Sequence, residues 1–395
     1  MFEFLVGLAT LGGVTSQTLM DTSFILIFLC FIFSAWKSKS VQPHFKPTGI
    51  EWAFLGYVFV VIVSLIINGK EPVPWLFYLS KFNWIINFYL LIYAFSKINV
   101  NYERWINFFS IAFLLPNIYA IVIYFLGYDL ITQKVIHGTV GLVNSATYHA
   151  HGNSLIFMFF VTIYLLNFEK IHKRTKISGA ITLCIMGISI FLTYTRGIWG
   201  ALFISLLILS YIKNKKLCLL YIISTTIILS IGLLTSETLY LRVVNSFSSD
   251  SDQMRSQLLQ VHWLMFKDHP WFGIGYWESY RQIADYWPRI GLPADHFESH
   301  SHNQYLNVLA TTGITGFIFF MSILVFFLRK SVSFMSKTFN DQLYPLACAC
   351  FLVLIQFLLA CLTDVTFEYS KIRMLVVITF AMLISFSQQK RQDQI

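Results

Sequence analysis

The chain has 395 residues, of which 56% are hydrophobic and only 12% are charged, and its formal net charge is +9. A soluble domain carries about 25% charged residues, whereas many apolar windows here approach the ~20 residues that a helix needs to cross a bilayer. The composition therefore predicts an all-α polytopic membrane protein and excludes a separate soluble domain. The basic residues occupy short loops and form no continuous stripe, which argues against nucleic-acid binding.

Window hydropathy along the chain predicts about twelve membrane spans. In order, the expected spans are 3–19, 22–36, 50–68, 76–96, 105–126, 152–168, 177–193, 198–212, 217–234, 303–328, 344–363 and 372–387. They divide the chain into a first block of helices at 1–234, a large polar insert at 235–302, and a second block with a cytoplasmic tail at 303–395. A shorter polar loop is expected at about 127–150.

The distribution of Lys and Arg predicts the orientation, because loops rich in these residues stay on the cytoplasmic side. Alternate loops, starting after the second span, hold 17 of the 28 basic residues. These are Lys37, Lys39, Lys46, Lys97, Arg104, Lys170, Lys173, Arg174, Lys176, Lys213, Lys215, Lys216, Arg329, Lys330, Lys337, Lys390 and Arg391. Both termini are therefore expected inside, and the insert, the 127–150 loop and Arg196 are expected on the outer face.

Within the insert, the apolar pattern from Met254 to Phe266 predicts an amphipathic helix on the membrane surface. The helix should end before Asp268, and the aromatic run 271–277 then predicts an interfacial turn. The sequence thus predicts a structured loop with amphipathic helices at 235–302.

His302 is the residue that we expect to carry chemistry, because it starts the span after the insert. Histidine changes charge near neutral pH and suits proton transfer. Gly313 and Gly316, in the same span, would let a neighbouring backbone approach closely and so fix the helix and its first side chain. His300 lies nearby, and together the two residues form an HxH pattern. A zinc site from His296, His300 and His302 is conceivable, but the pattern is weak support for zinc, and we expect no metal.

Arg196 and Arg255 are candidates for binding an anion, since a guanidinium stays charged and binds phosphate through two hydrogen bonds. A snorkelling interfacial arginine is the competing interpretation of Arg196. Arg242 is a weaker third candidate. The acidic triplet at 250–252 resembles the DxD of soluble nucleotide-sugar transferases, but a solvated turn is the better interpretation.

Three segments match the sequence patterns of a known family. They are His302-Asn303 followed after nine residues by Gly313-x-x-Gly316, Arg255 with Pro270-x-x-Gly273-x-Gly275, and the turn Thr195-Arg196-Gly197. The first pattern resembles the signature of O-antigen ligases. All three fit the wider superfamily of O-antigen ligases, O-antigen polymerases and protein O-oligosaccharyltransferases.

The resemblance implies a GT-C-like membrane glycosyltransferase in the bacterial inner membrane, with its active site facing the periplasm. Its donor would be a glycan on undecaprenyl pyrophosphate, and its acceptor would be a sugar hydroxyl of lipid A-core. His302 would act as general base and Arg196 and Arg255 would bind pyrophosphate, in an inverting transfer that needs no metal or other cofactor. His300, Asn303, Arg242 and His151 are possible supporting residues, and membrane lipids are the remaining partners.

Other functions fit parts of the same pattern. An O-antigen polymerase or a protein O-oligosaccharyltransferase would use the same class of donor. A lipid-glycan transporter predicts charged residues lining a path at mid-membrane, whereas the polar residues here collect at one rim. A structural assembly protein leaves the convergence of two arginines and a histidine unexplained.

Overall fold

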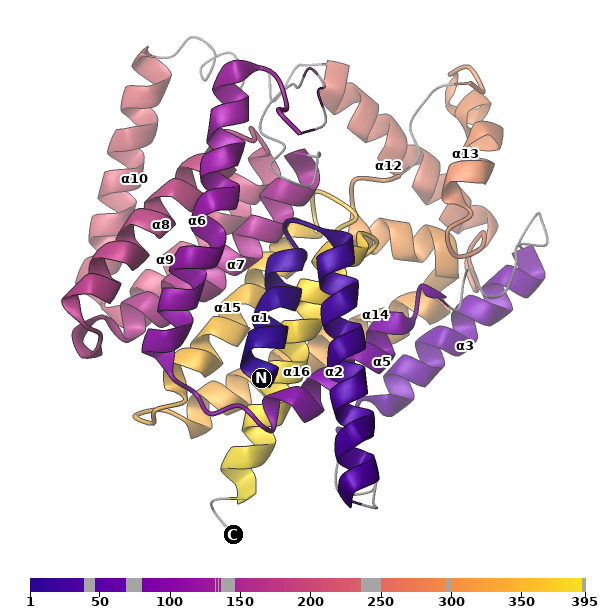
Figure 1. The fold of residues 1–395 in the computed structure, drawn as a ribbon. Helices are drawn as coiled ribbons and strands as arrows, with labels where there is room; N and C mark the ends of the chain where they lie inside the picture. The colour runs from indigo at the N-terminus through magenta and orange to yellow at the C-terminus, as the bar shows by residue number, and fades with distance from the viewer. Residues whose placement is uncertain are drawn as a thin grey trace.

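The computed structural model describes residues 1–38, 47–68, 80–131, 133, 135, 146–235, 250–295 and 300–392. Figure 1 shows a bundle of helices, with the C-terminus at one end and the helices labelled α12 and α13 at the other. In chain order the helices are α1 (Phe2–Gly12), α2 (Gln17–Ser38), α3 (Glu51–Asn68), α5 (Asn83–Phe95), α6 (Tyr102–Leu126), α7 (Ala146–Leu166), η3 (Phe168–Lys170), α8 (Lys173–Phe191), α9 (Arg196–Lys213), α10 (Lys215–Thr235), α12 (Asp250–Asp268), α13 (Ser279–Tyr286), η5 (Trp287–Ile290), α14 (Gln304–Lys337), α15 (Tyr344–Ala360) and α16 (Ser370–Gln392).

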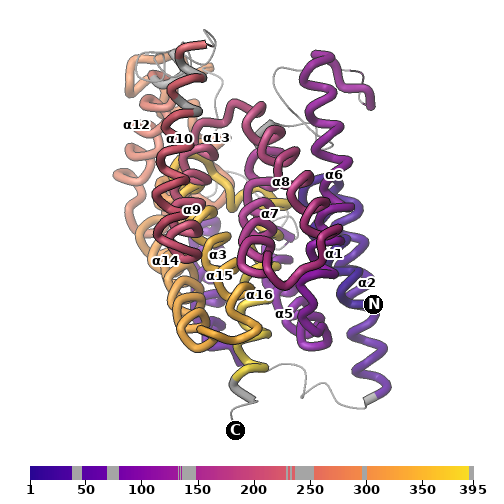
Figure 2. Tube along the Cα trace, turned by 90° about the vertical axis from the view of Figure 1, so that its left-hand side faces the viewer, coloured from indigo at the N-terminus to yellow at the C-terminus, as the bar shows by residue number. Residues whose placement is uncertain are grey.

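Among the described residues, eight helices are long and apolar enough to cross a membrane, and three shorter apolar helices lie beside them. The chain is therefore a polytopic all-α membrane protein, as its composition predicts. The predicted count of about twelve spans is not confirmed. The most apolar window of α7 and of α16 is 83% buried, whereas it is at most 33% buried in α2, α3, α6, α8 and α9. Figure 2 accordingly shows α7 and α16 inside the bundle.

The first predicted span, 3–19, is wrong in its boundary, because α1 ends at Gly12 and α2 already begins at Gln17. A Cβ atom at Gly12 would lie 2.5 Å from the backbone nitrogen of Met20. Only glycine allows this close approach of the two helices, so the chain turns here and not at residue 19, where the predicted span ends.

The predicted polar loop at 127–150 is shorter than expected, because α7 begins at residue 146 and includes His149 and His151. Polar partners on α8 and on α7 itself accommodate the His149 ring inside the bundle. The His149 ring lies 2.5 Å from the hydroxyl of Ser189 and 3.1 Å from Asn153. Because buried polar groups that have hydrogen-bond partners are tolerated, the helix extends beyond the apolar window.

The predicted span at 76–96 contains α5, which starts at Asn83, and its first residues, 76–79, lie outside the described part of the chain. Lys81 precedes the helix and places its ammonium 4.1 Å from the ring centre of Trp277. A cation therefore sits against an aromatic face in a polar environment instead of inside a membrane helix.

The predicted amphipathic helix of the insert is present as α12, which ends at Asp268. It packs on α13 and η5 through a small apolar cluster that includes Leu258, Val261 and Trp287. Figure 1 shows α12 and α13 together over one end of the bundle, which we call the α12–α13 end.

Between these two helices, residues 270–275 pass directly over a break in α14 at Gly313, whose φ of 67° and ψ of −171° are not helical. The backbone nitrogen of Ile314 donates to the Pro270 carbonyl at 2.8 Å, and that of Ile274 donates to the Ala310 carbonyl at 2.9 Å. A Cβ atom at Gly313 would lie 2.4 Å from the backbone of Trp271. The expected close backbone approach is thus present at Gly313, but the helix is interrupted there.

Gly316, in contrast, leaves room for a side chain of its own helix. A Cβ atom at this position would meet the side chain of Thr312, one turn earlier, at 2.1 Å. The expectation that both glycines receive a neighbouring backbone therefore holds for Gly313 alone.

Candidate active site

The first turn of α14 fixes the backbone around His302. Asn303 caps the helix, and its side chain accepts a hydrogen bond from the backbone nitrogen of Leu306 at 3.0 Å. The hydroxyl of Ser301 donates to the Asn303 carbonyl at 2.6 Å. Between them His302 has a φ of 49°, a left-handed conformation that is uncommon for residues other than glycine and is often associated with functional sites.

The loop 361–369, which joins α15 to α16, docks on this helix start. The backbone nitrogen of Gln304 donates to the Cys361 carbonyl at 2.8 Å, and the Gln304 side chain accepts from the backbone nitrogen of Phe367 at 2.9 Å. These two hydrogen bonds hold both ends of the loop. Asp364, at its centre, is thereby placed against the turn that carries His302.

Asp364 is the centre of a cluster of three imidazoles. Its Oδ2 lies 3.3 Å from Nε2 of His151, and its Oδ1 lies 3.7 Å from Nδ1 of His302 and 3.8 Å from Nε2 of His300. Burial by itself raises the pKa of Asp364, but the facing imidazoles of His151 and His302 hold this pKa well below its usual range. The carboxylate is therefore charged and can orient the rings around it.

Asp364 was missed by the sequence reasoning, although one signal was available. The predicted spans 344–363 and 372–387 leave a short loop between them, and the predicted orientation places this loop on the same side as the insert. A carboxylate in such a loop shares a compartment with His302, but nothing in the local sequence indicates that it meets three histidines.

Arg196 is the first residue of α9, and its helix start lies beside the same loop. A Cβ atom at Gly197 would be 2.1 Å from Oγ1 of Thr363, the neighbour of Asp364. The N-terminus of a helix carries partial positive charge and exposed N–H groups, which favour anions. The start of α9 thus brings its positive end beside the loop that carries Asp364.

Arg255 lies on α12 and is exposed. His262 follows it by nearly two helical turns, about 10 Å along the axis on nearly the same face. His262 is buried, and burial lowers its pKa to about 4, with a further contribution from the charges of His300 and His302. The helix that carries Arg255 thus also carries a histidine that feels the charges of His300 and His302.

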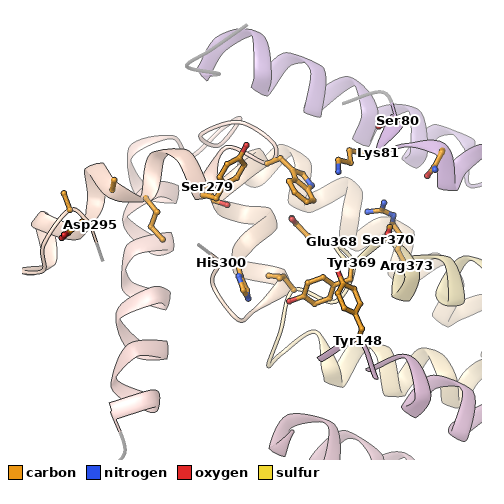
Figure 3. Close-up of a pocket in the computed structure, with 17 residues that line it drawn as sticks. Ser80, Lys81, Tyr148, Ser279, Asp295, His300, Glu368, Tyr369, Ser370 and Arg373 are labelled. Carbon is orange, nitrogen blue, oxygen red and sulfur yellow. The ribbon is translucent and has the colours of Figure 1, made fainter. Parts of the chain in front are cut away.

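A cavity of about 930 Å³ opens beside the cluster, at the large end of the range of roughly 300–1,000 Å³ for small-molecule sites. Figure 3 shows Lys81, Glu368 and Arg373 at one end of the cavity and Asp295 at the other, with His300 between them. Arg196, Arg255 and His302 are not among the residues that line it. Further lining residues are Ser80, Asn83, Tyr148, Trp277, Ser279, Tyr280, Ile283, Ala284, Ala294, Val365, Tyr369 and Ser370.

The charged residues of this cavity were also missed from the sequence. Asn307 donates a hydrogen bond of 2.5 Å to Glu368, and burial raises the pKa of Glu368 to about 7 despite the opposing charge of Arg373. Lys81 and Arg373 fell inside predicted spans, at 76–96 and 372–387. A lysine or arginine inside an apolar window could have indicated these residues, because placing a charged side chain in the membrane costs free energy and usually marks a functional site.

His300, His302 and Asp364 could also hold a cation, since one ligand atom from each lies within 4.8 Å of the others. Two imidazoles and one carboxylate form a ligand set that zinc accepts. Arg242 and His296 lie outside the described residues, so the structure places neither of them.

The fold and the cluster together define a polytopic helical membrane protein with a histidine–carboxylate site beside a large cavity that contains several charged residues. Residues 181–321 match the family model described as O-antigen ligase (Wzy_C), which supports assigning the chain to the O-antigen ligase family. The match confirms the resemblance predicted from the motifs and includes Arg196, Arg255 and His302. Asp364 lies beyond it. A comparison with curated proteins found no match.

Proposed function

We propose that this protein transfers an O-antigen glycan from undecaprenyl pyrophosphate to a sugar hydroxyl of lipid A-core, at the periplasmic face of the bacterial inner membrane. The family match supports an enzyme of the O-antigen ligase or polymerase type. The observation that carries the chemistry is the placement of His302 against Asp364 at the α12–α13 end. A GT-C-like arrangement of about twelve spans with both termini in the cytoplasm belongs to the same proposal.

His302 is the general base of the proposed reaction. Its Nδ1 faces Oδ1 of Asp364, so the carboxylate favours the tautomer with a proton on Nδ1 and leaves Nε2 to accept a proton. His300 presents the opposite nitrogen, Nε2, to the same carboxylate. His300 lines the cavity and is the alternative base, but its orientation suits a supporting role.

The proposed step is a single displacement. The acceptor hydroxyl oxygen attacks the anomeric carbon while His302 takes its proton, and the bond from that carbon to the pyrophosphate oxygen breaks with its electron pair moving to the leaving group. This inverts the anomeric centre without a covalent glycosyl-enzyme. Negative charge grows on the pyrophosphate, and cations placed in advance stabilise it best.

Arg196 and Arg255 are proposed to supply that stabilisation. Arg196 has the stronger structural support, because the start of α9 adds its dipole and lies beside Thr363. Arg255 projects from α12, the helix that also carries His262. Neither residue lines the cavity, so the pyrophosphate would lie at its edge and the sugars would lie inside it.

The acceptor is tested by incubating the purified protein with its lipid-linked glycan and purified lipid A-core, with and without EDTA. The proposal expects glycan joined to lipid A-core, at an unchanged rate in EDTA. Growth of the lipid-linked glycan alone would identify an O-antigen polymerase, and transfer to a protein would identify an O-oligosaccharyltransferase. A strong loss of rate in EDTA would show that the cluster of His300, His302 and Asp364 holds a cation.

A lipid-glycan transporter is the less favoured alternative. Asp364 and Arg373 are buried, and together with the half-buried Glu368 they lie in and beside one loop, at the end of the helices that carries α12 and α13. A transport path would need polar residues distributed along the membrane depth.

A further inference from the structure

The end of the cavity that lies away from Asp295 combines opposite charges in a way that the proposed base and pyrophosphate site do not explain. Lys81 meets Glu368 and Arg373 there from a distant segment of the chain (Figure 3). None of them contributes to the cluster around Asp364. The question is which chemical class of ligand this arrangement fits.

Arg373 provides the main observation. Its side chain is only 3% exposed, yet it lines the cavity. Nη1 donates to the Phe367 carbonyl at 3.1 Å, whereas Nε has no hydrogen-bond partner within the part of the chain that the structure describes. A buried guanidinium N–H without a partner is costly. A ligand in the cavity that offers an acceptor oxygen would satisfy it.

Glu368 determines what kind of oxygen fits. Its carboxylate already accepts one hydrogen bond from Asn307, and as an acceptor with several lone pairs it can take another. A phosphate between Glu368 and Arg373 would meet the guanidinium but would be repelled by the carboxylate. A hydroxyl group can accept from Arg373 and donate to Glu368 at the same time. The pair therefore suits a ligand with hydroxyl groups, which can bridge the two side chains by accepting from one and donating to the other.

The walls of this part of the cavity are aromatic. Tyr148 and Tyr369 stand edge to face with ring centres 5.0 Å apart, and Trp277 holds the ammonium of Lys81 over its ring. Trp277 has a φ of 64°, so its backbone is kept in an uncommon conformation that directs this residue to the cavity. Aromatic rings with a polar edge suit a ligand that is apolar on one face and hydroxylated on its rim.

We propose that the Lys81–Glu368–Arg373 end of the cavity is a subsite for a neutral sugar ring, with Glu368 and Arg373 binding its hydroxyl groups. This inference rests on the proposed function and adds to it a position for one of the reacting glycans. The sugar ring belongs either to the lipid A-core acceptor or to the first residues of the transferred glycan. Both sources present the same chemistry, and the experiment separates them.

The test measures binding without turnover. Protein in lipid nanodiscs is mixed with either the delipidated core oligosaccharide or the free O-glycan, and saturation-transfer NMR reports the sugar protons that contact the protein. The variants are Glu368→Gln and Arg373→Lys, which conserve size or charge. Asp285→Asn is the matched control, because Asp285 is an exposed carboxylate on α13 that does not line the cavity.

One of the two oligosaccharides should bind the wild-type protein, and its signal should fall at least fivefold in both variants but less than twofold in the control. Inorganic pyrophosphate should not displace it. The inference is overturned if neither oligosaccharide binds, if both variants bind as the wild type does, or if pyrophosphate competes. Sugar binding in a protein that transfers no glycan would keep the subsite and refute the proposed function.

Discussion

Two segments hold the start of α14, and they do so by different means. Residues 270–275 bind it through backbone hydrogen bonds across the break at Gly313. The loop 361–369 adds side chains, so that Gln304 accepts from Phe367 and Asp364 faces three imidazoles. The first segment sets where the helix lies, and the second sets the chemistry at its end. Changes in the first should therefore affect folding, and changes in the second should affect catalysis.

The largest effect is expected for Asp364→Asn, because an amide cannot stabilise the charge that forms on His302 or fix its tautomer. The rate of glycan transfer should fall by about 10²–10⁴-fold, the range for general acid–base catalysis. Yield and thermal unfolding should stay close to wild type, since an amide oxygen can still accept from the backbone nitrogen of Val365, as the Asp364 carboxylate does at 2.8 Å. Steady-state rates with both substrates measure this.

Asp341→Asn is the control for Asp364→Asn. Asp341 is also a loop carboxylate with a basic partner, Lys390, but it precedes α15, at the opposite end of that helix from the 361–369 loop. Its replacement should leave transfer within about twofold. Equal rate losses in the two variants would mean that Asp364 has only a general structural role.

Gly313→Ala should destabilise the fold, because the new Cβ atom would lie 2.4 Å from the Trp271 backbone and because φ is 67°. We expect a loss of roughly 3 kcal/mol, from the strain and the displaced backbone together. Gly200→Ala is the matched control, since no atom lies within 4 Å of the Cβ position there. Thermal unfolding in detergent should separate the two variants, and similar unfolding temperatures would show that residues 270–275 do not hold α14.

Arg196→Ala should act on the donor. If Arg196 contacts the pyrophosphate, its loss should lower kcat/KM for the lipid-linked glycan by roughly 10–100-fold, the value of one or two charge-assisted hydrogen bonds. The KM for lipid A-core should not change. Arg255→Ala should behave in the same way, and an effect of either variant on the acceptor alone would remove that residue from the pyrophosphate site.

The smallest effect concerns His262, a buried histidine on α12. Its folded pKa, about 4, lies below the ordinary value of 6.5. As pH falls below about 6.5 the unfolded chain takes up a proton that the folded protein does not, so stability is lost down to about pH 4. His262→Gln keeps a donor for the Leu258 carbonyl and does not titrate. The wild type should lose about 1 kcal/mol more than this variant between about pH 7 and pH 5.5, and parallel stability curves would refute the assignment.

The two regions also differ in how well sequence could predict them. The backbone conformations at 270–275 and at Gly313 require proline or glycine. They can be predicted from a single sequence because few other residues adopt them. Asp364 stands in an ordinary loop, and its importance arises from residues 151, 300 and 302, which meet it only in three dimensions. Window hydropathy assigned Lys81 and Arg373 to spans, because averaging over about twenty residues conceals one charge.

The central claim is that His302, oriented by Asp364, removes the proton from the acceptor hydroxyl. The most direct measurement compares the initial rate of glycan transfer to lipid A-core in His302→Ala and His300→Ala, with both variants shown to be folded by their thermal unfolding. The account predicts that His302→Ala abolishes transfer and that His300→Ala retains a measurable part of it. Transfer that survives in His302→Ala and disappears in His300→Ala would contradict it.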